Sequence, residues 1–154
     1  MRASLAAGCN LWNGGDFYGK PEHSPLTLLK KYYEKYPEDA DKVVLNIKGG
    51  TLPDLSPSES VKQSVENSFA MLGLRGKIGM FESARRDPKV PLQETLSALA
   101  ELVEEGKIGG VALSEVNAGT IREAAKIELS LFSTEFSTNG IAKACHELDI
   151  PIVA

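Results

Sequence analysis

The chain has 154 residues, of which 42% are hydrophobic and 25% are charged, a balance typical of a globular domain with a buried core. Its net charge of -4 and pI near 5.3 argue against a basic surface for nucleic acid or an anionic membrane. No apolar run reaches the ~18 residues of a transmembrane helix, and residues 1–8 are too weakly apolar for a signal peptide. We therefore expect a cytoplasmic protein of one domain, residues 1–154.

Apolar strand patterns and helical patterns alternate along the whole chain. Strands are expected at residues 9–12, 43–47, 78–81, 108–113, 127–132 and, as the start of one more, 151–154. Helices are expected between them at residues 26–36, 56–72, 91–105, 118–126 and 140–148. Ser56, Pro57 and Glu59 provide a cap residue, a first-turn proline and an acid for the second of these helices. Gly106 is placed to end the third.

This alternation indicates parallel strands joined by right-handed crossovers. The fold class is therefore α/β, either an open doubly wound sheet or part of a (β/α) barrel. No glycine-rich phosphate loop follows the first strand, so the sequence gives no support to a flavodoxin-like domain with a phosphate ligand. Cys9 and Cys145 lack the spacing of a metal site, and we expect two buried free thiols and no metal.

Two polar residues have the chemistry and the positions suited to delivering a proton to a carbonyl group. Tyr18 lies in a glycine-rich loop, and Lys48 ends an apolar strand in which Asn46 shares its face. A polar residue at the last position of a parallel strand suits a site at the carboxyl edge of the sheet. A phenol titrates near ~10 in water, and a neighbouring ammonium lowers that pKa. The pair is therefore a candidate for general acid chemistry.

Five segments, in order, resemble one enzyme family. They are residues 12–19 (WNGGDFYG), 48–50 (KGG), 81–88 (FESARRDP), 101–110 (ELVEEGKIGG) and 113–116 (LSEV). The chain is similar to the aldo-keto reductases and, more closely, to their fungal pyridoxal reductase branch. The resemblance implies a (β/α)8 barrel that reduces a small aldehyde or ketone with NADPH. Pyridoxal is the aldehyde that the branch implies.

The resemblance also implies catalytic roles, and each catalytic residue of the family can be matched to one position of this sequence. Tyr18 matches the proton donor, and Lys48 matches the lysine that tunes it. The family's aspartate falls on Asn13, which can accept a hydrogen bond from Lys48 but brings no charge. The family's histidine falls on Ala84, which has no donor, and the pyridoxal reductase branch shares both departures.

Other positions match the binding of cofactor and substrate. Ser114 and Glu115 match the serine–asparagine pair that holds the nicotinamide amide, although a glutamate can accept but not donate. Ala84 lies on the substrate side, and Trp12 is either a wall of the substrate pocket or a core residue. Glu82 would point into the barrel, where a buried acid needs a partner, either Lys48 or Asn46.

Three remaining polar residues have plainer interpretations. Asp16 could approach the substrate, but we favour a solvated loop acid. His23 and His146 miss the family's histidine position and are expected at the surface.

A barrel of this family takes ~250 residues, and this chain matches only strands two to seven of eight. It enters at the family's first helix (residues 3–7), stops where the seventh strand starts, and skips about eight residues after Lys126, compared with ordinary connections of about 2–6. We expect an incomplete barrel of about six parallel strands that is weakly active or inactive. The alternative function is a non-catalytic fragment that self-associates or binds a partner through its open sheet edges.

Overall fold

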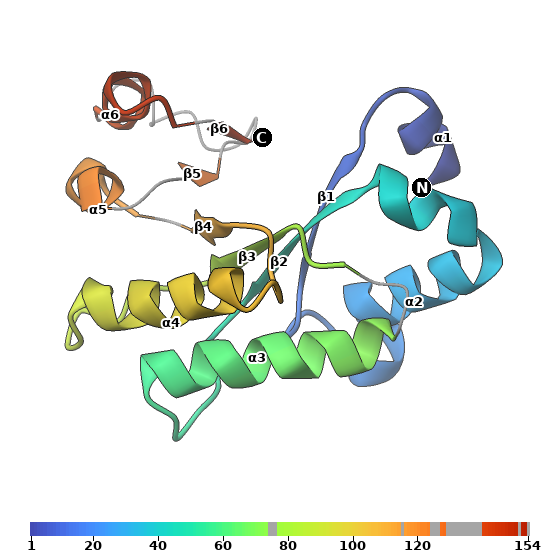
Figure 1. Cartoon of the computed structure of the whole chain (residues 1–154), viewed down its shortest axis with the longest axis horizontal. Helices are drawn as coiled ribbons and strands as arrows, with labels where there is room; N and C mark the ends of the chain where they lie inside the picture. Colours follow the sequence, from blue (N-terminus) through green and yellow to red (C-terminus); the bar gives the residue numbers. More distant parts are fainter. Residues whose placement is uncertain (74–76, 115, 124–126, 129–139, 151, 154) are drawn as a thin grey trace.

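A parallel four-stranded sheet forms the centre of the molecule (Figure 1). The computed structural model describes residues 1–73, 77–114, 116–123, 127–128, 140–150 and 152–153. The strands follow the order β1 (Leu11–Gly15), β2 (Val44–Gly49), β3 (Met80–Ser83) and β4 (Val111–Leu113). A second parallel pair, β5 (Ile127–Glu128) and β6 (Ile152–Val153), lies beyond β4. The prediction of an α/β fold with about six parallel strands is confirmed.

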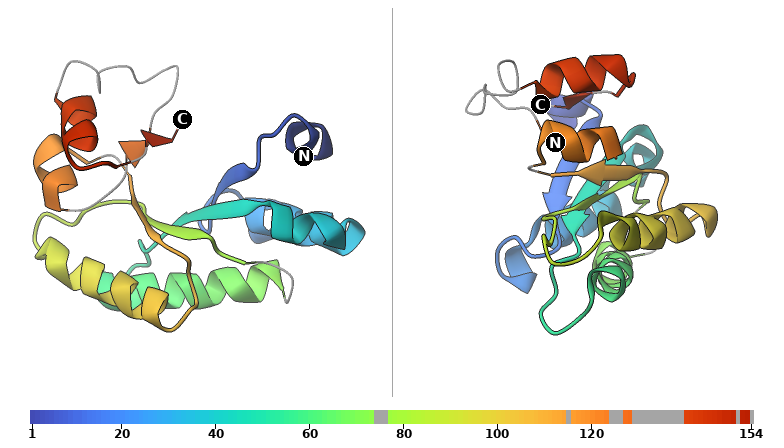
Figure 2. Two further views of the ribbon diagram at one scale, coloured as in Figure 1. Left: turned by 45° about the horizontal axis from the view of Figure 1, so that its top comes forward. Right: turned by 90° about the vertical axis from the view of Figure 1, so that its left-hand side faces the viewer.

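The helices follow the strands in the predicted alternation, and α3 and α4 lie side by side along one face of the sheet (Figures 1 and 2). The α-helices are α1 (Arg2–Ala6), α2 (Pro25–Lys35), α3 (Pro57–Leu72), α4 (Leu92–Glu104), α5 (Ala118–Glu123) and α6 (Ile141–Glu147). Two 3-10 turns, η1 (Pro21–His23) and η2 (Pro37–Lys42), flank α2. The predicted residues 124–126, 129–132, 151 and 154 lie outside the described part of the chain.

Local signals in the sequence set where α3 begins and α4 ends. The Ser56 hydroxyl accepts from the Glu59 backbone N–H, and the Glu59 carboxylate accepts from the Ser56 N–H at 3.1 Å, which completes a capping box. Gly106 follows α4 with φ +70°, a conformation that a side chain disfavours. Both predicted helix ends are confirmed.

Strand boundaries differ more from the prediction. The strands predicted to start at Ile78 and Ile108 start two and three residues later, because those two residues pair only as an isolated bridge. Gly79 and Gly109 come directly after them, and glycine weakens a strand interior. β1 runs on to Gly15, past the predicted end at residue 12, because its last residues pair with β2.

The apolar core lies between the sheet and the helices. Buried side chains from the strands and from α2, α3 and α4 form one cluster, which includes Leu26, Leu29, Leu45, Ile47, Val61, Val65, Phe81, Leu99 and Leu102. Alternate strand residues point to the other face, and three of these, Asn46, Lys48 and Glu82, are polar and buried. The two faces of the sheet therefore differ in chemistry, and the polar one carries the candidate site.

Two expectations from composition can be compared with the structure. Cys9 is exposed and Cys145 is buried, and both thiols are free, so the expectation that both are buried is wrong for Cys9. Cys9 stands just before β1 rather than inside it, which leaves its side chain outside the core. Within the described residues, no helix has the length and apolarity to cross a membrane, and no group of three or more metal-ligating side chains occurs.

A buried carboxylate ties α2 to η2. Tyr32 donates from its hydroxyl to Asp39 at 2.7 Å, and the Lys42 ammonium donates to the other Asp39 oxygen at 2.8 Å. The hydrogen bond from Lys42, followed by that from Tyr32, lowers the pKa of Asp39. Burial, followed by the bond to Asp39, raises the pKa of Tyr32 to about 12.

This carboxylate makes folding stability depend on pH. The folded pKa of Asp39 lies below its unfolded value of about 3.9, so the carboxylate stabilises the fold above that pH. The contribution is lost as the pH falls through the folded pKa. We expect Asp39→Asn to reduce stability at neutral pH and to flatten the acid side of the profile, measured by urea unfolding across the acid range. The exposed Asp54→Asn is the control, and an unchanged acid slope in Asp39→Asn would contradict the prediction.

Candidate active site

A buried ion pair lies on the polar face of the sheet. Lys48 in β2 and Glu82 in β3 are register partners, so their side chains lie on the same face. The Lys48 Nζ lies 3.2 Å from the Glu82 Oε1, and the two side chains are only 6% and 4% exposed. Strand register thus brings together two charged groups that are 34 residues apart in the sequence.

Two amides bind the second oxygen of the same carboxylate. Asn46 donates from Nδ2 to the Glu82 Oε2 at 2.5 Å, and Asn13 in β1 makes a longer contact to that oxygen at 3.5 Å. Asn13 and Asn46 are themselves register partners. The expectation that Glu82 pairs with Lys48 or Asn46 is confirmed for both. From the sequence, Asn13 can accept a hydrogen bond from Lys48; its contact as a donor to Glu82 was not predicted.

Tyr18 lies in the loop that leaves β1, close to the Lys48 position. Its ring packs on Gly15, where an added Cβ would stand 2.9 Å from the Tyr18 Cδ2, so this close approach requires glycine. Gly15 is the register partner of Lys48 in β1. The next residue, Asp16, donates its N–H to the Lys48 carbonyl at 3.0 Å. The Tyr18 side chain remains 41% exposed and meets the Phe17 ring edge to face.

The remaining predicted site residues differ in where they lie relative to the Lys48–Glu82 pair. Ala84 and Ser114 are buried directly after the carboxyl ends of β3 and β4, respectively. They therefore lie at the same edge of the sheet as the carboxyl end of β2. Trp12 points the other way: its ring packs against Tyr32 of α2 at 5.4 Å between centroids, as the core alternative supposed. Its role as a substrate wall stays a prediction. Glu115 lies outside the described residues.

Asp16 is half-buried, although we favoured a solvated acid. Burial raises the pKa of Asp16, while a hydrogen bond from Ser64 of α3 opposes that rise. The Asp16 carboxylate faces α3, the helical side of the sheet, and so supports the loop that carries Tyr18. His23 and His146 are exposed, as expected.

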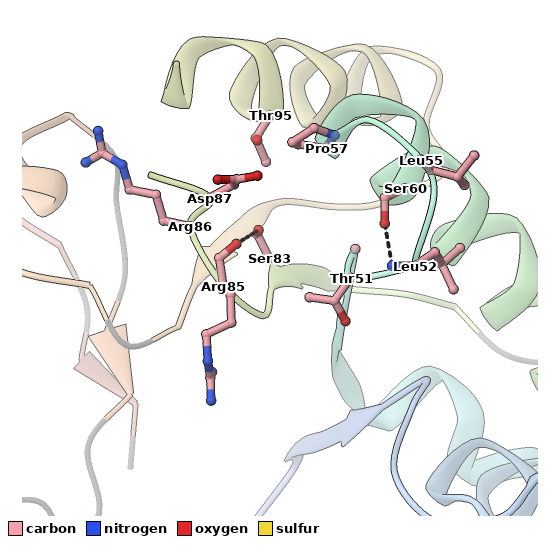
Figure 3. A pocket seen from close by; sticks show the side chains of 11 residues that line it. Thr51, Leu52, Leu55, Pro57, Ser60, Ser83, Arg85, Arg86, Asp87 and Thr95 are labelled. Carbon is pink, nitrogen blue, oxygen red and sulfur yellow. Dashed lines mark hydrogen bonds between the residues drawn. The ribbon is translucent and has the colours of Figure 1, made fainter. Parts of the chain in front are cut away.

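A cavity of 210 Å³ opens beside this edge of the sheet, between the loops that follow β2 and β3 (Figure 3). Its lining includes Thr51, Ser60, Ser83, Asp87 and Thr95. In Figure 3 the guanidinium groups of Arg85 and Arg86 lead away from the centre of the cavity. Ligands of parallel α/β folds bind at the carboxyl ends of the strands, and this cavity lies there. The sequence indicated helix-start residues in the segment from Thr51 to Ser60 but no binding role for it.

Comparisons with known proteins agree on one family. The family model described as "Aldo/keto reductase family" matches residues 1–154. "Probable pyridoxal reductase 2" of Schizosaccharomyces pombe is 44% identical over 167 residues, covering 100% of this chain and 50% of the relative. "Putative pyridoxal reductase" of Saccharomyces cerevisiae is 40% identical, covering 92% of this chain and 46% of the relative. The chain thus spans about half the length of the curated relatives it matches.

The alignment with the S. pombe relative also bears on the predicted internal gap. It runs over 167 positions against the 154 residues of this chain, so at least 13 positions of that relative face a gap here. This supports the expectation that residues are skipped within the matched span. The placement of the gap after Lys126 stays a prediction.

The solved structures support the fold. The crystal structure of an aldo-keto reductase from Klebsiella pneumoniae in complex with NADPH superposes with a TM-score of 0.77. The match covers 99% of this chain and 54% of that one at 20% sequence identity, so it bears on the fold alone. It decides between the two α/β architectures in favour of part of a (β/α) barrel. The family model, the relatives and the fold together show that this chain belongs to the aldo/keto reductase family.

Proposed function

We propose that this chain carries the proton-donating part of an NADPH-dependent aldehyde reductase site, with pyridoxal as the substrate. The observation that carries the proposal is the buried Lys48–Glu82 pair beside the Tyr18 loop, at the carboxyl edge of a parallel sheet. The substrate follows from the two relatives whose names describe pyridoxal reductases. The cofactor follows from the family and from the structural neighbour in complex with NADPH.

Each residue then has a chemical task. NADPH, when bound, supplies the hydride that reduces the aldehyde carbon. Tyr18 gives its hydroxyl proton to the carbonyl oxygen, which leaves an alcohol and a phenolate. The Lys48 ammonium stabilises that phenolate, and the exposed edge of the Tyr18 ring lets solvent return the proton. Ala84 carries only a methyl group, so its position adds no second donor.

The position of Ser114 supports a proposed contact with the cofactor's amide. Ser114 is buried directly after β4, where its N–H donates to the Ser83 carbonyl at 3.3 Å and fixes the backbone. Its hydroxyl can donate to, or accept from, a carboxamide. Glu115 would accept from the carboxamide NH₂. We assign both residues to the nicotinamide end of NADPH.

The test uses two proteins: the 154-residue chain, and a chimera in which this chain replaces the matching segment of the S. pombe relative. NADPH oxidation with pyridoxal is followed by the loss of NADPH absorbance, and the alcohol product by chromatography. We expect the chimera to turn over pyridoxal and the chain alone to be weakly active or inactive. A folded chimera that forms no alcohol from pyridoxal would overturn the proposal.

A second function, self-association, is favoured by the free side of β1. In the described residues β1 pairs only with β2, and beside it lies a cleft of 380 Å³ lined by Leu11, Trp12, Leu28 and Leu29. Leu28 is 58% exposed. An unpaired strand next to apolar side chains promotes pairing between copies. Light scattering of the chain should then show an oligomer that grows with concentration, whereas a monomer that binds NADPH would refute this second function.

A further inference from the structure

The lysine of the candidate site needs a negative partner, and Asn13 cannot provide one. We propose that Glu82 is the positioning residue that keeps Lys48 ionised and fixed at the site. The carboxylate for Lys48 thus comes from β3 rather than from the β1 position of Asn13. This inference rests on the proposed function for its chemical meaning, but its test does not require turnover.

The first argument is electrostatic. The Lys48 side chain is only 6% exposed, so its ammonium loses most of its hydration. The free-energy cost of this dehydration is large unless an opposite charge lies close by. Glu82 places an oxygen 3.2 Å from the Lys48 nitrogen. The half-buried Asp16 carboxylate is directed to Ser64 on the helical side of the sheet. Of these two carboxylates in the described part of the chain, Glu82 is therefore the one that the geometry assigns to Lys48.

The second argument is the fixed geometry of Glu82. Its Oε1 faces Lys48, while its Oε2 receives the amides of Asn46 and Asn13. The ion pair at one oxygen and the amide donors at the other hold the carboxylate in one orientation. Glu82 thus acts through Lys48 and not on the substrate, which is why we describe it as a positioning residue.

The third argument comes from the arrangement of the strands. β2 lies between β1 and β3, so a carboxylate on either neighbouring strand can reach the polar face beside Lys48. The Asn13 amide already extends to within 3.5 Å of the Glu82 carboxylate. An aspartate at position 13 would therefore bring its charge to the same group of side chains. This predicts that the carboxylate can be moved from one strand to the other.

The experiment measures Lys48 directly in the 154-residue chain. Nitrogen-15 NMR at neutral pH detects the side-chain ammonium of a buried, ion-paired lysine, and Lys48→Met identifies its signal. We expect Glu82→Gln to lose this signal and Glu82→Asp to keep it in weakened form. The double variant Asn13→Asp/Glu82→Gln should regain it. Glu101→Gln, which breaks the exposed ion pair with Lys62, is the matched control and should leave it unchanged.

Circular dichroism establishes that each variant is folded. A folded Glu82→Gln variant that keeps the Lys48 ammonium signal would overturn the inference. If Glu82→Gln does not fold, the double variant decides the question. A folded double variant with the signal restored supports the inference, and one that stays unfolded or lacks the signal overturns it. Failure of the proposed function would appear separately, as a chimera that does not reduce pyridoxal.

Discussion

Replacing Tyr18 by phenylalanine is expected to lower kcat for pyridoxal in the chimera by about 10²- to 10⁴-fold, the usual contribution of a general acid. The substitution removes one hydroxyl and keeps the ring that packs on Gly15. Because Tyr18 is 41% exposed, the fold loses little, and we expect a change in unfolding free energy within about 0.5 kcal/mol. Steady-state NADPH oxidation measures the first effect and urea unfolding the second.

The control for this prediction is a second tyrosine that lies away from the site. Tyr36→Phe removes the phenol hydroxyl of a partly buried side chain next to Arg2, at the C-terminal end of α2, whereas the Tyr18 loop precedes the N-terminal end of that helix. It should leave kcat unchanged. Turnover by Tyr18→Phe at the parent rate would remove this phenol from the mechanism.

Replacing Lys48 by methionine is expected to have the largest effect on stability. It leaves the Glu82 carboxylate buried without its cation, and breaking a buried pair in this way costs about 3–5 kcal/mol. Asn46 and Asn13 still donate to the carboxylate, so we expect the lower end of that range. The measurement is the free energy of unfolding of the 154-residue chain in urea at neutral pH.

A double variant separates the lost charge from lost packing. Lys48→Met/Glu82→Gln removes both charges and keeps an oxygen that can accept from Asn46. It should recover most of the stability that the single variant loses, and the double-mutant cycle then gives the coupling energy of the pair. If the double variant is as unstable as Lys48→Met alone, the loss comes from packing and the ion pair contributes little.

Local rules explain why much of the fold was predictable. The Ser56–Glu59 capping box and the glycine after α4 act within a few residues, so the sequence alone predicted both helix ends. Strand ends were less predictable because they depend on pairing with another strand. Ile78 and Ile108 have strand character, but the glycines that follow leave them joined by a single bridge.

For the candidate site, sequence motifs proposed which residues take part, and strand parity predicted which side chains share a face. Motif and spacing singled out Tyr18, Lys48 and Asn13, and the need of a buried acid for a partner singled out Glu82. Neither motifs nor parity could predict which group donates in a contact or toward which element a side chain turns. Asn13 serves as a donor to Glu82, and Asp16 turns toward α3, because both depend on groups brought near by other strands and helices.

The sequence by itself determined the α/β class, the order of its elements and the family, because periodicity, caps and motifs are properties of neighbouring residues. Only the tertiary structure decided which carboxylate accompanies Lys48. That choice depends on the register between β2 and β3, which brings the Lys48 Nζ within 3.2 Å of the Glu82 Oε1 at a buried position, although the two residues are far apart in the chain. Register is fixed by the packing of the whole sheet on its helices, and no local pattern encodes it.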